Sequence, residues 1–311
     1  MLNLIQNEWM KLWSKKGTWV MVILLAAIII GFTGITKLSE NLFDDSEWRE
    51  SLEAELTDVE KELASPDLAE EENAELEMHR EDIQENIAFS IENSKPQTRE
   101  PIIADTFGIM SIVTLLTIIV ASGIVSTEFS EGTIKMLLSR PVKRWKILTS
   151  KYLTVILFCL FVTGVTYAAS VIGAFIFFPG STESTFMFYE TELATSAVWG
   201  KSLYMMLLAF INSVVISTLA FTLETVFRST SLAIGISIFL YFTGGMIVMF
   251  LSKYEIAKYI LFAHTNLTQY ETGYATFDDL TMPFSVVIII VYTLVFLALS
   301  FWSFTKRDVT A

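Results

Sequence analysis

The chain has 311 residues, of which 53% are hydrophobic, and its formal net charge is −13. Its apolar share exceeds that of ordinary soluble domains, which favours a membrane protein. A single cysteine, Cys159, excludes an intrachain disulfide framework and a cysteine-rich zinc cluster. Because Cys159 lies within an apolar run, we expect a buried helix residue rather than a reactive thiol.

The negative charge belongs to one segment. Residues 37–105 hold 22 acidic and 6 basic residues, a net charge of −16, whereas the rest of the chain has a net charge of +3. The isoelectric point of the whole chain therefore says nothing about its partners, and we expect no nucleic acid among them.

Residues 1–17 predict an amphipathic helix that lies in the membrane surface. Tryptophans and other apolar residues share one face, and polar and basic residues share the other. The apolar face holds Ile5, Trp9, Leu12 and Trp13, and the polar face holds Gln6, Asn7, Lys11 and Lys15. Such a helix suits the headgroup layer.

Six apolar segments are long enough to cross a bilayer, and they are apolar on every face, which predicts helices rather than the alternating strands of a β-barrel. They are residues 18–36, 103–125, 153–178, 203–227, 232–251 and 284–304. The sequence therefore predicts an all-α integral membrane protein with six transmembrane helices.

Basic residues near the span ends predict the orientation. Twelve of them fall on one side if the spans alternate, and this side is normally cytoplasmic. Both termini, the connection 126–152 and the tail 305–311 are then cytoplasmic, in a multi-pass protein of a bacterial cell membrane. The outward segments are 37–102, 179–202 and 252–283.

The acidic segment 37–102 predicts an extracellular helical hairpin over residues 47–93. Leu52, Leu56, Val59 and Leu63 repeat at helical spacing, and a second, narrow apolar stripe follows Pro66. The hairpin is either a solvated spacer or cap, or an arm that attracts a cationic ligand. No calcium-loop pattern occurs in it.

In the last outward segment, 252–283, Tyr254, Ile256, Ile260 and Leu261 have an apolar spacing that suits short helices. Neither His79 nor His264 has a neighbour at metal-ligand spacing, so we expect solvated or interfacial histidines and no metal site.

The fourth span carries the polar residues that a pathway or gate would need. Glu224 and Arg228 stand one turn apart and predict an ion pair, with a gating or proton-linked role as the alternative. Asn212 and Ser217 belong to a polar stripe with Ser213 and Thr218. Helix–helix hydrogen bonding is the expected use of this stripe, and lining a substrate path is the alternative.

The chain resembles the permease subunits of ABC-2 type transporters in several short motifs. They are Asn7-Glu8-Trp9, Glu131-Gly132-Thr133, Leu137-Leu138, Pro141 followed by Arg144, Asn266-Leu267 and Lys306-Arg307-Asp308. The resemblance implies docking of a separate ABC ATPase on the opening helix and the coupling loop 126–152. The implied contacts are Glu8, Trp9, Glu128, Glu131, Gly132, Thr133, Leu137, Pro141 and Arg144. It also implies short re-entrant or interfacial helices in the outward segment 252–283, and pairing with a second permease, identical or related.

No phosphate-binding Gly-x-x-x-x-Gly-Lys-Ser/Thr loop occurs in the sequence, so we expect ATP to bind to the partner and this chain to hold no cofactor. We expect no enzymatic activity, because no catalytic constellation stands within the spans. The expected function is export of amphipathic or lipid-like cargo, with peptide antibiotics as one candidate. The alternative is a membrane receptor or scaffold that senses an extracellular ligand through the acidic hairpin.

Overall fold

A computed structural model of the chain describes residues 1–42, 46–64, 70–94, 97–130, 142–189, 191–275, 277 and 279–306. The described chain is mostly helical. Six of its helices are long and apolar enough to cross a membrane, as predicted, and the protein is a multi-pass membrane protein. These stretches are Lys16–Ser39, Arg99–Glu128, Arg144–Phe177, Thr195–Phe227, Thr230–Leu251 and Met282–Lys306.

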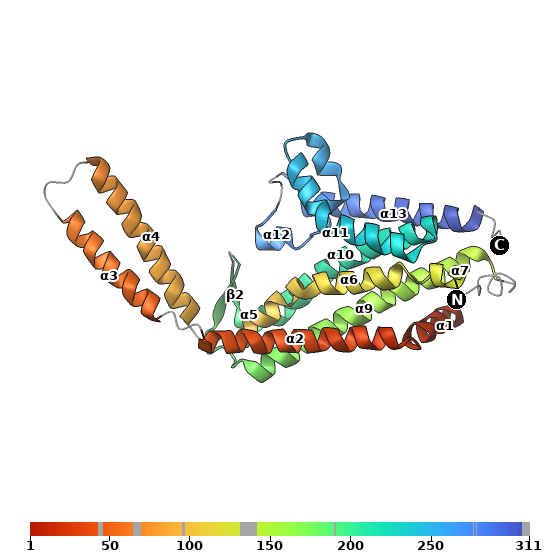
Figure 1. The fold of residues 1–311 in the computed structure, drawn as a ribbon, viewed down its shortest axis with the longest axis horizontal. Helices are drawn as coiled ribbons and strands as arrows, with labels where there is room; N and C mark the ends of the chain where they lie inside the picture. Colours follow the sequence, from red (N-terminus) through yellow and green to blue (C-terminus); the bar gives the residue numbers. More distant parts are fainter. Residues whose placement is uncertain are drawn as a thin grey trace.

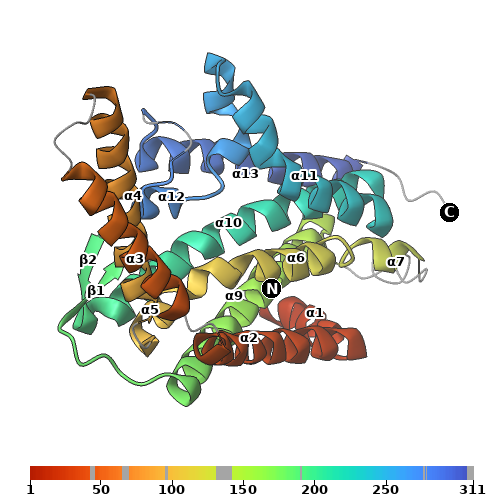
Figure 2. The same cartoon turned by 60° about the vertical axis from the view of Figure 1, so that its left-hand side comes forward.

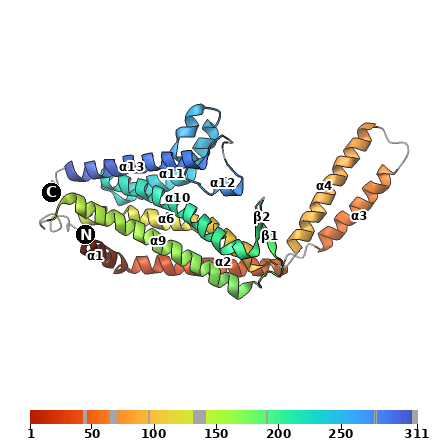
Figure 3. The same ribbon diagram turned by 180° about the vertical axis from the view of Figure 1, so that it is seen from behind.

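The long helices run side by side between two distinct ends of the molecule (Figure 1). Both termini lie at one end, together with the short helix α7 (Ser126–Ser130), and we call it the terminal end. The opposite end, called the hairpin end, carries α3 (Ser46–Leu63) and α4 (Glu70–Ser94), which project beyond the bundle. The view from behind shows the same division (Figure 3).

The centre of the bundle is α10 (Val198–Phe227), whose apolar stretch is 67% buried, against 17% for α11 (Thr230–Leu251) and α13 (Met282–Lys306). It lies between α13 on one side and α6 (Met110–Ala121) and α9 (Arg144–Phe177) on the other (Figure 2). Pairs of hydroxyl groups join α10 to these helices at four levels among the described residues. The pairs are Ser202 with Tyr167 at 3.0 Å, Ser213 with Thr114 at 2.7 Å, Thr218 with Tyr152 at 2.9 Å, and Thr222 with Ser300 at 3.0 Å.

The second and third spans differ from the predicted boundaries. The second is not one helix: α5 (Arg99–Ala104), a 3₁₀ turn (Asp105–Ile109) and α6 follow one another, and a turn over residues 122–125 then separates α6 from α7. The third, α9, begins at Arg144, inside the predicted connection 126–152. Hydropathy detected only its apolar part, because the first two turns carry basic residues.

The segment before α10 contains a two-stranded antiparallel sheet, so the all-α prediction is wrong there. Strands β1 (Thr185–Phe188) and β2 (Thr191–Ala194) pair with Thr185 opposite Ala194. Strands of four residues are too short to show a clear period-2 pattern. Beside them, α3 and α4 pack together through Leu52, Val59 and Ile83.

The stretch between α11 and α13 folds into short turns of helix. They are Glu255–Tyr259, Leu261–Ala263 and α12 (Gln269–Thr272). The Phe262 ring packs so closely on Gly244 that an added Cβ would approach it to 2.3 Å. His264, predicted to be solvated or interfacial, is fully buried instead, because Ser285 and the Lys258 carbonyl satisfy its two ring nitrogens.

Candidate functional site

Four charged side chains meet at the terminal end, from segments far apart in the sequence. Lys151 of α9 donates to Glu8 Oε2 at 2.8 Å, to Glu128 Oε1 at 3.0 Å and to the Ile124 carbonyl at 2.9 Å. Lys11 donates to the same Glu128 oxygen at 2.6 Å. We call Glu8, Lys11, Glu128 and Lys151 the ion cluster. It joins α1 (Leu2–Trp13), α7 and α9.

Three of the four side chains in the ion cluster are removed from solvent, Lys11 is 37% exposed, and the four charges sum to zero. The side chains of Glu128 and Lys151 are each 1% exposed, and that of Glu8 is 7% exposed. Burying an ion costs several kcal/mol, and the attraction of close partners offsets this cost only when all charges are paired. Among the described residues, two carboxylates and two ammonium groups meet this condition, so loss of a buried member leaves an uncompensated charge.

Local sequence explains how each member reaches the cluster. Lys151 lies on the buried face of α9, one turn after Ile147 and one turn before Val155, so its ammonium must point inward. On α1, Glu8 and Leu12 form the buried face. The chain then turns sharply into α2 (Lys16–Leu42), and Thr18 secures this corner by donating its hydroxyl to the Leu12 carbonyl at 2.8 Å.

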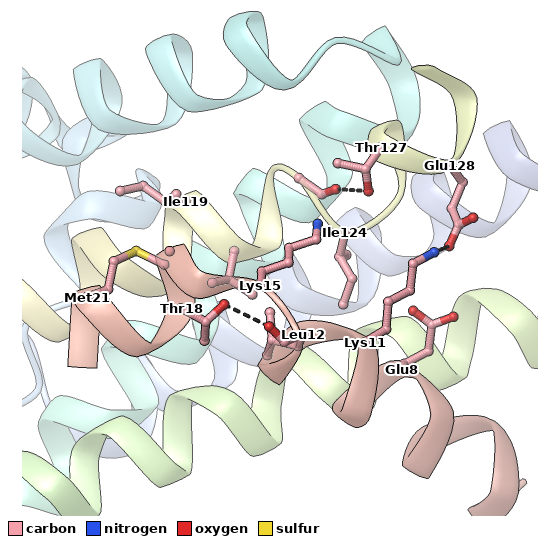
Figure 4. A pocket seen from close by; sticks show the side chains of 13 residues that line it. Glu8, Lys11, Leu12, Lys15, Thr18, Met21, Ile119, Ile124, Thr127 and Glu128 are labelled. Atoms are coloured by element: carbon pink, nitrogen blue, oxygen red, sulfur yellow. Dashed lines mark hydrogen bonds and ion pairs between the residues drawn. The ribbon is translucent and has the colours of Figure 1, made fainter. Parts of the chain in front are cut away.

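A cavity of about 180 Å³ opens beside the ion cluster, between the α1–α2 corner and the turn that joins α6 to α7 (Figure 4). Glu8, Lys11, Lys15 and Glu128 are its charged lining. The rest of its wall is mostly apolar and includes Leu12, Met21, Ile119, Val120 and Ile124. Polar groups and an apolar wall meet in one recess.

A second buried acid supports the α6–α7 turn. Glu224 of α10 is fully buried, and its Oε1 accepts the backbone N–H groups of Val125 at 2.7 Å and Ser126 at 2.6 Å. Its Oε2 has no hydrogen-bond partner within the described part of the chain. A carboxylate beside the first N–H groups of a helix stabilises that terminus.

The predicted Glu224–Arg228 ion pair is wrong, because the Glu224 carboxylate bonds to backbone of the α6–α7 turn instead. Arg228 ends α10 in a left-handed conformation, with φ 54°, and its backbone N–H donates to the Glu224 carbonyl at 2.7 Å. The i, i+4 spacing allowed a pair, but the helix already ends at Phe227.

The hydrogen bonds made by the polar stripe of α10 connect this helix to its neighbour or to its own backbone. Ser213 bonds across to Thr114, and Ser217 donates to the Ser213 carbonyl of its own helix at 2.5 Å. The Asn212 Oδ1 atom is buried and, among the described residues, lacks a hydrogen-bond partner.

The residues predicted to contact an ATPase divide into three groups. Glu8 and Glu128 point into the ion cluster rather than outward. Trp9 packs on Trp13 and Phe161, and Arg144 reaches the Thr305 carbonyl at 3.4 Å. The other five, Glu131, Gly132, Thr133, Leu137 and Pro141, lie outside the described residues.

Sequence reasoning missed Lys151 as a member of the site and placed Lys11 on the polar face of an interfacial helix. A signal for Lys151 was present, since a lysine on the apolar face of a helix needs a partner. No group of three or more histidine, cysteine, aspartate or glutamate side chains suited to a metal ion occurs within the described ranges.

Comparison with known proteins places the chain in a family. The model of the family described as "Protein of unknown function (DUF2705)" matches residues 77–310. The chain belongs to this family. The uncharacterized protein YhcI of Bacillus subtilis (strain 168) is 35% identical over 315 residues, which cover 99% of each chain. The uncharacterized membrane protein YdbK of the same organism is 32% identical over 62% of this chain and 76% of its own.

These matches correct the family prediction. The matching family is one of unknown function, and neither relative is named as a permease. Membership in the ABC-2 type permease family, predicted from short motifs, is therefore wrong. Each of those motifs spans only two to four residues, and such short patterns recur by chance in helical membrane proteins.

Proposed function

We propose that this chain is the membrane subunit of an ATP-driven exporter and that a separate ATPase subunit supplies the energy. The ion cluster carries the proposal. It fastens α1, α7 and α9 to one another at the end of the bundle where residues 131–141 link α7 to α9. A partner that pushes on this link would move three elements together rather than one loop.

The proposed orientation puts the terminal end in the cytoplasm. Twelve basic residues near the span ends support it, because cytoplasmic connections are enriched in lysine and arginine. In this arrangement α1 is an interfacial helix, with Trp9 and Trp13 at headgroup depth, and both termini are cytoplasmic. The acidic helices α3 and α4 then form an extracellular hairpin.

The partner in this proposal binds ATP, since the sequence lacks a phosphate loop. It would contact residues 131–141, including Glu131, Gly132 and Thr133, and the outer surface of α1. Two membrane subunits, identical or related, would form the pathway between them. The largely unburied apolar faces of α11 and α13 leave surface for a second subunit or for lipid.

The proposed cargo is amphipathic or lipid-like, such as a peptide antibiotic. A cavity of about 760 Å³ at the hairpin end supports this class. Phe186 and Met187 supply apolar surface there, and Glu183 and Glu192 supply negative charge. Such a mixed lining fits a molecule with an apolar body and a cationic group.

The same cavity favours a second candidate function, that of a receptor or scaffold. It lies near the base of the acidic α3–α4 pair, where a ligand attracted by that negative charge would arrive. A receptor would bind its ligand without any ATPase, whereas an exporter subunit would be inactive without one. Dependence on an ATPase therefore separates the two functions.

The test first looks for an ATPase gene beside this gene, and then cross-links Thr133→Cys to that ATPase with both proteins co-expressed. Cys159 is buried, so background labelling should be low. Thr191→Cys, exposed at the hairpin end, is the matched control. We expect a cross-link from position 133 alone and ATP hydrolysis by the purified pair. Lack of a neighbouring ATPase, or equal cross-linking from both positions, would contradict the proposal.

A further inference from the structure

The cavity beside the ion cluster combines a cationic rim with an apolar interior. Lys11 and Lys15 reach it from the α1–α2 corner, and Figure 4 shows Lys15 extending across it toward the α6–α7 turn. Met21, Ile119 and Val120 form the apolar wall. The recess therefore suits a ligand with an anionic group at one end and hydrocarbon at the other.

The charge balance of the recess leaves one cation for a ligand. Lys151 and Lys11 are engaged with the two carboxylates of the ion cluster. The Lys15 ammonium has no ion-pair partner among the residues that the structure describes, although its side chain lines the cavity. Within the described residues the ion cluster is neutral and the exposed Lys15 adds a charge of +1, so the rim of the recess attracts an anion.

The cavity lies at one end of the first membrane-spanning helix, where lipid headgroups would be expected. Its lining includes Gly17 and Thr18, in the first turn of the first membrane-spanning helix. Trp13 and Trp19 pack edge to face beside this turn, with ring centroids 4.8 Å apart, as aromatic residues do at membrane interfaces. Ile119 is 38% exposed on the outer surface, so the apolar wall continues toward surrounding lipid.

We propose that this recess binds an anionic phospholipid, with its phosphate at Lys15 and Lys11 and the start of an acyl chain along Met21 and Ile119. A volume of about 180 Å³ accommodates a headgroup fragment and leaves the rest of the lipid in the bilayer. The bound headgroup would contact both the α1–α2 corner and the α6–α7 turn, and so hold them together. This site does not depend on the proposed transport role.

The test uses the full chain purified in neutral detergent and measures lipid binding by native mass spectrometry. The probes are phosphatidylglycerol, phosphatidylcholine and inorganic phosphate. The charge variant is Lys15→Ala, and its matched control is Lys16→Ala, the neighbouring exposed lysine outside the cavity lining. A second variant, Ile119→Trp, fills the recess without changing any charge.

We expect phosphatidylglycerol to bind in preference to phosphatidylcholine, and Lys15→Ala to weaken its binding about fivefold. Lys16→Ala should leave binding close to that of the unchanged protein, and Ile119→Trp should abolish the preference.

Equal losses for both lysine variants would overturn the site, because they would indicate general surface attraction. Displacement by inorganic phosphate would assign the recess to a soluble anion, and conversion of a dimer to a monomer by Ile119→Trp would assign it to a second copy. Either result would overturn the proposal that a phospholipid occupies the recess.

Discussion

The two ends of the molecule place ion pairs in opposite environments. At the terminal end, Lys151 pairs with Glu8 and Glu128 while 1% of its side chain is exposed. In α3, Lys61 pairs with Asp58 at 2.8 Å with side chains 70% and 75% exposed. Water screens the second pair but not the first. Distance alone therefore does not rank ion pairs, and burial decides which of them hold the fold together.

The largest expected effect is that of Lys151→Met. It leaves Glu8 and Glu128 buried without their shared cation, and breaking a buried pair typically lowers the free energy of unfolding by about 3–5 kcal/mol. Thermal unfolding of the purified protein in detergent measures this loss. Lys143→Ala, an exposed lysine just before α9, is the control and should change little. Adding Glu8→Gln and Glu128→Gln to Lys151→Met should restore most of the loss, and failure to do so would contradict charge imbalance as the cause.

The next effect concerns Glu224, the acid that binds the α6–α7 turn. Glu224→Ala leaves the N–H groups of Val125 and Ser126 without their acceptor. Hydrogen bonds to a charged group contribute about 1.5–3 kcal/mol, so we expect a loss of about 2 kcal/mol in the free energy of unfolding. Glu224→Gln keeps one carbonyl acceptor and should lose less than half of this amount. If the two variants were equally unstable, the negative charge rather than the acceptor geometry would be responsible.

A smaller effect should follow from pH. Burial lowers the pKa of His264 below its ordinary value because it penalises the charged ring, although the hydrogen bond to the Lys258 carbonyl opposes this shift. The unfolded chain then binds a proton near pH 6.5 that the folded chain does not, so stability falls as pH drops below about 6.5. The slope from this one group is at most about 1.4 kcal/mol per pH unit.

Melting temperatures between pH 7.5 and 5.5 measure this slope. We expect His264→Gln to flatten it, whereas His79→Gln, which changes an exposed histidine of α4, should leave it in place. An unchanged slope in His264→Gln would show that other groups are responsible for the pH dependence.

The smallest effect is expected for Lys61→Ala at the hairpin end. Exposed ion pairs one helical turn apart contribute little, so unfolding should be unchanged within error. A loss comparable to that of Lys151→Met would show that the exposed and buried pairs do not differ as described here.

Much of the fold could be predicted because bilayer thickness dictates the length of an apolar run. The six spans followed from this rule, and the basic first turns of α9 were missed since the rule sees only apolar residues. The ion cluster could be predicted in part from the sequence. Lys151 stands at helical spacing from Ile147 and Val155, and this spacing indicates a buried charge. Its partner Glu8 stands 143 residues away, and only packing could join them. The position of Glu224 marked it as important, but the sequence predicted an ion pair with the nearest cation, Arg228. Local spacing cannot reveal its hydrogen bonds to the distant α6–α7 turn.

The central place of α10 has a consequence for how the protein is made. Ribosomes deliver the chain from its N-terminus, so α2, α6 and α9 enter the bilayer before residues 198–227 have been synthesised. Until then Thr114 and Tyr152 lack the hydroxyl partners that α10 brings, whereas α2 and α6 can already pack on α9. The nascent chain can therefore hold α2, α6 and α9 as a partial bundle, which is completed when the fourth span leaves the translocation channel.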